Sequence, residues 1–186
     1  AEDGIRDHCV TGVQTCALPI SLGVAGAQNT FGAGIDTLLN FENLTGSNFN
    51  DVLSGNAGNN VLDGGAGQDK LTGGAGRDVF VFTAATDSPN SLPDVITDFN
   101  RLLGDRIDVS AIDANTSLAG NQAFTWVGLV SPFGLIAQGN LGYQVSGSDL
   151  ILLGNTGTGP VAFSPDFRVL LQGSAPSGIT ALDVTL

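Results

Sequence analysis

The stretch GSNFNDVLSGNAGNNVLDGGAGQDKLTGGAGRDVFV, residues 46–81, repeats one nine-residue pattern four times without a gap. Each copy begins with six glycine-rich residues that end in Asp or Asn, and then places one large apolar residue between two neighbours. A degenerate fifth copy, FGAGIDTLL, occupies residues 31–39. A strict period of this kind predicts a stack of short, equivalent structural units.

The two halves of each copy predict a turn followed by a very short strand. Glycine reaches positive φ without a Cβ clash, which suits the first half. A single apolar residue between outward-facing positions suits a strand buried on one face. We therefore expect an all-β fold with a parallel coil over the repeats, in which the buried positions are Leu53, Leu62, Leu71 and Phe80.

Apolar packing alone should not stabilise this coil. Fixing nine residues costs on the order of 9–18 kcal/mol of backbone entropy, whereas one buried leucine returns only about 1.5–3 kcal/mol. The acidic side chains also converge on the turns and repel one another. Ca²⁺ binds about six to eight oxygen atoms of carboxylates and backbone carbonyls, and would reverse that repulsion. The pattern therefore predicts calcium as a structural component.

The spacing also predicts which side chains meet. If two copies make one turn, Asp51 stacks with Asp69 and Asn60 with Asp78, and a cation lies between successive turns. A flexible Gly/Asn/Asp linker is the alternative, but a linker needs no leucine at every ninth position. A dinucleotide-binding loop is disfavoured because the glycine spacing never opens a long helical pattern.

Residues 1–20 match nothing that follows and resemble the in-frame translation of a sequencing adapter. We expect this segment to be an artefact and disordered, and the natural chain to begin further upstream. A signal peptide is disfavoured because the segment lacks a basic start and a continuous apolar stretch. His8, Cys9 and Cys16 do not supply a closed ligand set for a metal. Residues 21–45 are then expected to form a degenerate leading repeat.

Charge and composition narrow the class of protein. The net charge of −12 disfavours nucleic acid and anionic membranes as partners. No apolar run approaches the roughly 20 residues of a membrane span. Both cysteines lie in residues 1–20, and the absence of cysteine elsewhere fits the cytosol as well as the outside of the cell. Calcium dependence favours a secreted, extracellular chain.

The segment after the repeats makes the reading more specific. The repeats resemble the calcium-binding repeats of RTX proteins. The downstream pieces resemble the C-terminal domain of serralysin-type metalloproteases, and the repeat modules of alginate epimerases carry a similar cap. This resemblance implies a right-handed parallel β-roll over 46–94 and an antiparallel β cap over 95–186. The pieces that carry it are DVFVF (78–82), TDS (86–88), DVITDF (94–99), GDRIDVSAID (104–113) and QAFTWVG (122–128).

The resemblance also implies a set of calcium ligands. Asp87 follows Asp78 by nine residues and takes the place of a further repeat aspartate, and Asp94 begins DVITDF. Asp98, Asp105 and Asp108 are read mainly as cap-forming or solvated. The expected side-chain ligands are Asp51, Asn60, Asp69, Asp78, Asp87 and Asp94. The expected carbonyl ligands, at repeat positions two and four, are Ser47, Phe49, Asn56, Gly58, Gly65, Gly67, Gly74 and Gly76.

The sequence cannot build the zinc motif of serralysins, because His8 is its only histidine. We therefore expect no enzyme activity from this fragment, although its missing N-terminal region is compatible with a metalloprotease. The predicted function is a calcium-binding module, monomeric, that folds outside the cell and directs type I secretion, with an ABC exporter as partner. The alternative is an adhesion or ligand-binding module of a large RTX adhesin or an extracellular polysaccharide enzyme.

The C-terminal residues ALDVTL (181–186) resemble the export signal of the same family, in which an acid precedes a short apolar tail. An ordinary final strand is the alternative reading. Both are kept as expectations.

Overall fold

The computed structural model describes residues 19–24, 26–29, 35–38, 41–130, 134–157, 164–174 and 178–186. Within these ranges the regular structure consists of β-strands and one short 3₁₀ helix, η1, so the all-β prediction is confirmed. The strands are β1 (Pro19–Ser21), β2 (Ala27–Asn29), β3 (Ile35–Thr37), β4 (Asn43–Thr45), β5 (Val52–Ser54), β6 (Val61–Asp63), β7 (Lys70–Thr72), β8 (Val79–Val81), β9 (Asp94–Ile96), β10 (Arg106–Asp108), β11 (Thr125–Leu129), β12 (Asn140–Ser146), β13 (Asp149–Gly154), β14 (Phe167–Leu171) and β15 (Val184–Thr185), and η1 is Ala181–Asp183.

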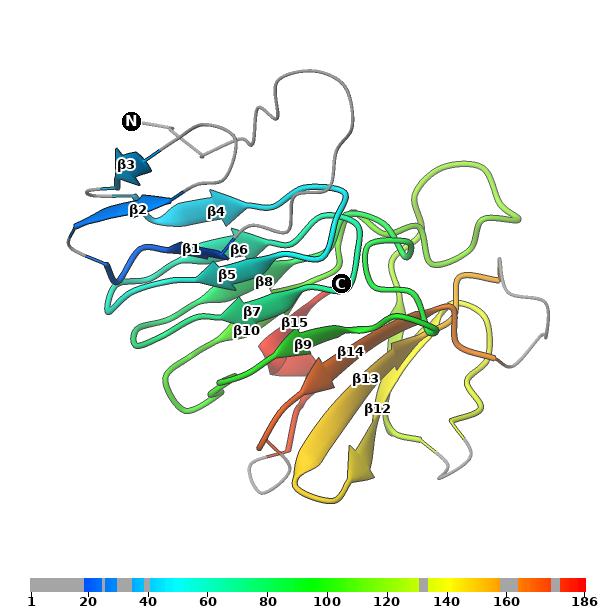
Figure 1. The fold of residues 1–186 in the computed structure, drawn as a ribbon. Coiled ribbons are helices and arrows are strands. Elements are labelled where there is room, and N and C mark those ends of the chain that lie inside the picture. The colour runs from blue at the N-terminus through cyan, green and yellow to red at the C-terminus, as the bar shows by residue number, and fades with distance from the viewer. Residues whose placement is uncertain are drawn as a thin grey trace.

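The repeats form a roll in which successive strands alternate between two parallel sheets. One sheet contains β1, β5, β7 and β9 in that order, and the other contains β4, β6, β8 and β10. Leu53 pairs with Leu71 and Leu62 with Phe80, so strands two repeats apart are neighbours. Two repeats therefore make one turn, as the spacing predicted, and Figure 1 shows the resulting stack of short strands.

Each repeat strand contributes one side chain, that of its middle residue, to the core of the roll. In β5, β6 and β7 the middle residue is buried and the first is exposed. The inward residues pack into one continuous apolar cluster with the core of the cap. Each burial stabilises the fold by about 1.5–3 kcal/mol. The innermost side chains of the roll, each at most 1 % exposed, are Leu44, Leu53, Leu62, Leu71 and Phe80.

The cap extends one of the two roll sheets. Strand β14 pairs in parallel with β9 and then antiparallel with β13, and β13 pairs antiparallel with β12. The antiparallel cap is therefore confirmed for β12–β14, but the last strand, β11, runs parallel to β12. Figure 1 shows these longer strands continuing sideways from β9. Phe82 packs edge-on against Phe167 at a centroid distance of 5.3 Å, which joins roll and cap.

The N-terminal boundary differs from the expectation. Residues 1–18 lie outside the described residues, but Pro19 and Ile20 belong to β1, which pairs in parallel with β5. The prediction of disorder over 1–20 is therefore wrong at these two residues. The physical reason is that Ile20, 2 % exposed, takes the same inward position as Leu53, with which it is paired.

The degenerate copy does not continue the roll in the described part of the chain. Its strand β3 pairs antiparallel with β2 in a separate two-stranded sheet. The strand that pairs with β6 at this end of the roll is instead β4, which follows residues 31–39. Residues 30–34, 39 and 40 lie outside the described residues.

The C-terminus closes the other end of the roll. Strand β15 pairs in parallel with β10 and is the outermost strand of its sheet. The structure therefore shows a final strand at the position where the sequence also suggested an export signal. None of the helices among the described residues is long and apolar enough to span a membrane.

Candidate metal centres

Column 1 is a ladder of acidic side chains at the start of β5, β7 and β9: Asp51 and Asp69 immediately precede their strands, and Asp94 is the first residue of β9. The backbone N–H of Asp51 donates to Oδ1 of Asp69 over 2.7 Å. The N–H of Asp69 donates in the same way to Oδ1 of Asp94, also over 2.7 Å. Each carboxylate thus reaches back to the preceding turn: Asp69 stacks on Asp51, as the spacing predicted, and Asp94 stands next to Asp69.

Column 2 is the equivalent ladder before β6, β8 and β10. The N–H of Asn60 donates to Oδ1 of Asp78 over 2.8 Å, and the N–H of Asp78 donates to Oδ1 of Asp105 over 3.0 Å. The members of both columns are at most 2 % exposed. The roll therefore buries two rows of polar side chains along its length.

Three carboxylate oxygens in these columns lack a hydrogen-bond partner. They are Oδ2 of Asp69, Asp78 and Asp94, and all three are buried. A buried ionised group with an unsatisfied oxygen is strongly destabilising unless a cation or a donor compensates it. The donor set is therefore suited to a hard cation, which binds carboxylate oxygen directly.

The electrostatics of the columns agree with this reading. Burial raises the pKa of Asp94 to about 8 and that of Asp69 to about 7, although backbone N–H donors oppose the shift. Burial likewise raises the pKa of Asp78 to about 6. Neighbouring carboxylates add to each shift, with Asp87 acting on both Asp69 and Asp94. Without a cation, the charged form of these groups is disfavoured.

The predicted carbonyl ligands lie in pairs across successive turns. Ser47 O accepts a hydrogen bond from Ala66 N over 3.1 Å, next to Gly65, and Asn56 O accepts one from Ala75 N over 3.0 Å, next to Gly74. A Cβ on either glycine would collide with the facing carbonyl oxygen. Glycine is required here because the turns approach this closely. The four pairs are Ser47 with Gly65, Phe49 with Gly67, Asn56 with Gly74 and Gly58 with Gly76.

Carboxylates alone do not complete a coordination shell. Across the described ranges, no group of three or more His, Cys, Asp or Glu side chains is arranged to hold a metal ion. The columns instead supply one side chain per turn, with backbone carbonyls close by. This mixed oxygen set fits calcium, which accepts carbonyl and carboxylate ligands together.

Comparison with known proteins agrees with this geometry. Residues 45–80 match the family model of the RTX calcium-binding nonapeptide repeat, in four copies. These residues are RTX calcium-binding repeats. Repeats of this family bind calcium ions. A comparison with curated proteins finds no match.

Two solved structures are similar to the chain, and both are subunits of the mannuronan C5-epimerase of Azotobacter vinelandii. The AlgE6R2 subunit is 29 % identical, with 76 % of this chain and 78 % of that chain covered and a TM-score of 0.48. The AlgE6R3 subunit is 29 % identical, with 77 % of this chain and 76 % of that chain covered and a TM-score of 0.44.

Asp87 keeps the RTX register only locally. Its Oδ2 accepts the N–H of Thr83 over 2.8 Å, just as Oδ2 of Asp51 accepts the N–H of Ser47 over 2.6 Å. The next position in column 1 is nevertheless taken by Asp94. Residues 88–93 leave the roll to contact β14, where the N–H of Arg168 donates to the carbonyl of Ser88, and the strand restarts only at Asp94.

Asp105 was missed as a member of the columns. It is 2 % exposed and accepts from Asp78 N and Asn100 N, so the reading of Asp105 as cap-forming or solvated was wrong about its burial. A signal was present, because the acid–x–apolar order of the repeats recurs as Asp105–Arg106–Ile107. Asp98 has a different role: its two oxygens accept the N–H groups of Gly73 and Gly74 over 2.9 and 2.8 Å.

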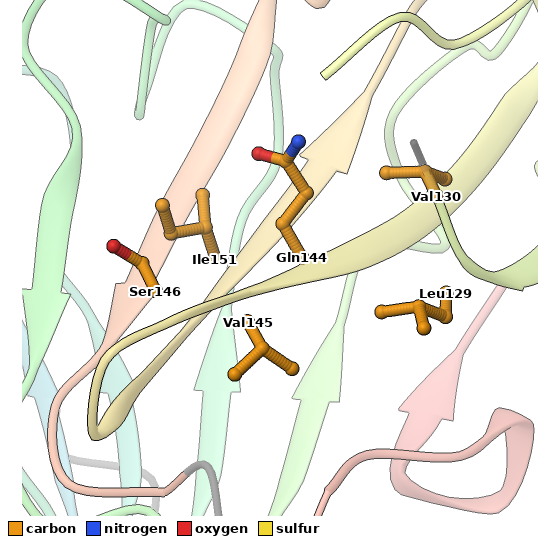
Figure 2. Close-up of a pocket in the computed structure, with 6 residues that line it drawn as sticks. All are labelled: Leu129, Val130, Gln144, Val145, Ser146 and Ile151. Carbon is orange, nitrogen blue, oxygen red and sulfur yellow. The ribbon is translucent and has the colours of Figure 1, made fainter. Parts of the chain in front are cut away.

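The cap carries a surface pocket. It has a volume of about 370 Å³ and is lined by residues of β11–β13 and by the residue that follows β11 (Figure 2). None of its lining residues is a carboxylate, so it lacks the donor set of the columns. The lining residues are Leu129, Val130, Gln144, Val145, Ser146 and Ile151.

Proposed function

We propose that this chain is a calcium-dependent folding module of a secreted protein. The observation that carries the proposal is the set of three buried carboxylate oxygens without partners, on Asp69, Asp78 and Asp94. The proposed side-chain ligands are the members of the two columns together with Asp87. The proposed carbonyl ligands are the four pairs at repeat positions two and four.

In the folded roll, the chain's own backbone orients these oxygens. Backbone N–H groups of Asp51, Asn60 and Asp69 each hold one oxygen of the next column member, which leaves the second oxygen of Asp69, Asp78 and Asp94 free to face a ligand. Both oxygens of Asp105, in contrast, accept backbone N–H groups. When bound, calcium supplies positive charge that offsets the burial of the carboxylates. Binding and folding are therefore one process, because the unfolded chain cannot gather these donors.

The linkage between calcium binding and folding determines the calcium concentration at which the module folds. An ion that binds only the folded state stabilises it by about 2.7 kcal/mol per site at one hundred times Kd. Extracellular calcium modules bind with Kd roughly 10⁻⁴–10⁻³ M. We therefore propose that the roll is open in the cytosol and folds in millimolar calcium outside the cell, as a substrate of a type I ABC exporter requires.

A calcium titration of the full chain, followed by far-UV circular dichroism, tests the folding role. The β signal is expected to develop over the millimolar range and to be lost in excess chelator. A full β signal in excess chelator would overturn the proposal.

Export is tested separately, with a variant that keeps the fold. Deleting residues 183–186 would remove β15, so a substitution is preferable. The side chain of Thr185 is exposed, and Thr185→Lys should abolish secretion by a matching exporter while calcium-induced folding persists. Ser148→Lys, at another exposed position, is the control. Equal secretion of both variants would mean that the export signal lies elsewhere in the chain.

A further inference from the structure

The end of the chain and the last loop of column 2 meet in one cluster of charged side chains. Oδ2 of Asp183 lies 3.3 Å from Nε of Arg101, and its Oδ1 lies 3.6 Å from Nη1 of Arg106. The N–H and the hydroxyl of Thr180 both donate to Oδ2 over 2.8 Å. Asp183 is 4 % exposed, so this carboxylate is buried and contacted by two cations.

Both arginines belong to the segment that closes column 2. Arg101 lies in the loop between β9 and β10, and Arg106 follows Asp105 directly. Nη1 of Arg106 donates to the carbonyls of Gly104 and Asp105 over 3.2 and 2.8 Å. Oδ2 of Asp105 accepts the N–H of Asn100 over 2.8 Å, which folds the loop back on itself. The segment that brings Asp105 into the column thus also carries two guanidinium groups, both of which contact Asp183, and the charge of Arg106 acts on Asp105 as well.

This arrangement poses an electrostatic problem that Asp183 resolves. Two positive charges next to a divalent-cation site disfavour the cation through Coulomb repulsion, and the repulsion is stronger where water is excluded. Asp183 contributes a negative charge that neutralises part of this field. It also holds Arg106, whose guanidinium group donates to the carbonyls of Gly104 and Asp105, one on each side of the Asp105 Cα.

The C-terminal residues dock on β10, the strand that directly follows Asp105. Val184 pairs with Ile107, and Val109 N donates to the carbonyl of Thr185 over 3.0 Å. Val184 is 6 % exposed, so β15 is part of the folded core. Figure 1 shows β15 beside β10 at the end of the roll. Strand β10 therefore lies between the last column member and the C-terminus.

We infer that Asp183 is a positioning residue for the last calcium turn, so that calcium binding at column 2 and docking of the C-terminal strand are thermodynamically linked. The inference rests on the proposed calcium function. Linkage is reciprocal: if the docked end raises calcium affinity by some factor, calcium raises the docking equilibrium by the same factor. One consequence is that Asp183 and Val184 are accessible to an exporter only before calcium has folded the chain.

The first test compares calcium midpoints of full-length variants by far-UV circular dichroism. Asp183→Asn should raise the midpoint about tenfold, because it removes the negative charge that both guanidinium groups contact. Asp108→Asn removes one negative charge from β10, where the carboxylate of Asp108 accepts from the N–H and the hydroxyl of Ser110, and should change the midpoint less than about twofold. Equal shifts in the two variants would overturn the inference.

A second substitution separates neutralisation from general damage to the strand. Adding Arg101→Gln to Asp183→Asn removes one of the two positive charges, so the double variant should bind calcium more tightly than Asp183→Asn alone. Asp183→Glu should also recover part of the loss. A double variant weaker than Asp183→Asn would contradict the electrostatic role.

The third test uses the wild-type chain, so it remains informative even if Asp183→Asn does not fold. The wild-type chain is digested with a carboxypeptidase, with and without calcium, and the release of Leu186 and Thr185 is followed by mass spectrometry. Calcium should slow their release at least about tenfold. Unchanged release from a chain that circular dichroism shows to be folded would overturn the inference and leave the calcium function intact. Failure of calcium to fold the wild-type chain would overturn both the inference and the proposed calcium function.

Discussion

The roll and the cap share one sheet but are stabilised in different ways. Strands of the roll are three residues long and bury one side chain in each of β5, β6 and β7. Strands β12–β14 are five to seven residues long and form an antiparallel ladder. Their buried positions hold only apolar residues or glycine, namely Leu141, Gly142, Leu150, Leu152, Leu153, Gly154, Phe167, Val169 and Leu171.

The buried positions next to the roll strands are instead acidic or amide side chains. Asp69, Asp78 and Asp94 are at most 1 % exposed, and each leaves one oxygen unsatisfied. A roll with one apolar side chain per nine residues cannot offset its chain entropy by burial alone. The comparison teaches that the cap is stabilised by its own apolar side chains, whereas the roll buries carboxylates for which we propose that an ion compensates. Each prediction below probes that difference.

The largest effect is expected from Asp69→Ala. This change removes the acceptor of Asp51 N and one of the carboxylates in column 1. The calcium midpoint should rise about thirtyfold or more, since a hydrogen bond to a charged group contributes about 1.5–3 kcal/mol. Asp149→Ala, in the β12–β13 hairpin of the cap, is the matched control and should leave the midpoint within about twofold. Both midpoints are measured by circular dichroism, and equal shifts would refute the assignment of column 1.

A smaller difference is expected between two glycines with positive φ. A Cβ at Gly67 would lie 2.7 Å from the carbonyl carbon and oxygen of Phe49, whereas a Cβ at Gly147 meets nothing within 4 Å. Gly147→Ala should cost about 1–2 kcal/mol from backbone strain alone. Gly67→Ala should cost clearly more, because two turns of the roll must separate. Urea denaturation in saturating calcium measures both, and similar losses would mean that the turns do not need this close approach.

The third prediction concerns pH. Burial raises the pKa of Asp94 to about 8, of Asp69 to about 7 and of Asp78 to about 6. Because these values exceed the unfolded value near 3.9, the calcium-free roll binds more protons than the unfolded chain. Its stability is therefore greatest below about pH 4 and falls as pH rises towards 8.

Calcium should show the opposite trend. Binding requires ionised carboxylates, and in the unfolded, calcium-free chain these groups ionise near about pH 4. The calcium midpoint should therefore fall as pH rises from about 3 to about 6 and should change little from about 6 to about 8. Calcium titrations followed by circular dichroism at each pH check this, and a midpoint that keeps falling up to about pH 8 would show that calcium binds to an already folded roll with protonated acids.

The smallest effect is expected from Asn60→Asp. Asn60 is the amide member of column 2, and its Nδ2 donates to the carbonyl of Glu42 over 3.2 Å. The aspartate adds a charged ligand but loses this donor. Calcium affinity should increase about threefold, while the calcium-free form becomes less stable. Paired titrations with and without chelator check both directions, and weaker calcium binding would indicate that the bond to Glu42 matters more than charge.

The sequence predicted the roll well because its information is local. A glycine turn followed by one apolar residue recurs every nine residues, and this period sets the pairing of Leu53 with Leu71 and of Leu62 with Phe80. The stacking of Asp51 with Asp69 and of Asn60 with Asp78 follows from the same period. Family resemblance was needed for Asp94, because no nine-residue step leads to it.

Tertiary packing decided how the roll ends. The register carries Asp87 to the expected turn, yet Asp94 occupies column 1 because residues 88–93 leave the roll to meet β14. Asp105 enters column 2 through a loop whose length the repeat does not encode. The pairing of β15 with β10 joins residues far apart in the chain, so the sequence favoured an export signal at 181–186 and kept a final strand only as the alternative.

By itself, then, the sequence determined the nine-residue unit, its two-repeat turn and its calcium-binding character, because each depends on residues close together in the chain or a fixed multiple of nine apart. Only the tertiary structure decided which acids close the two columns and what the C-terminus contacts. The physical reason is that these positions depend on where non-repetitive loops return to the sheet. That return is set by the packing of β14 and β15 against the roll, and no local pattern specifies it.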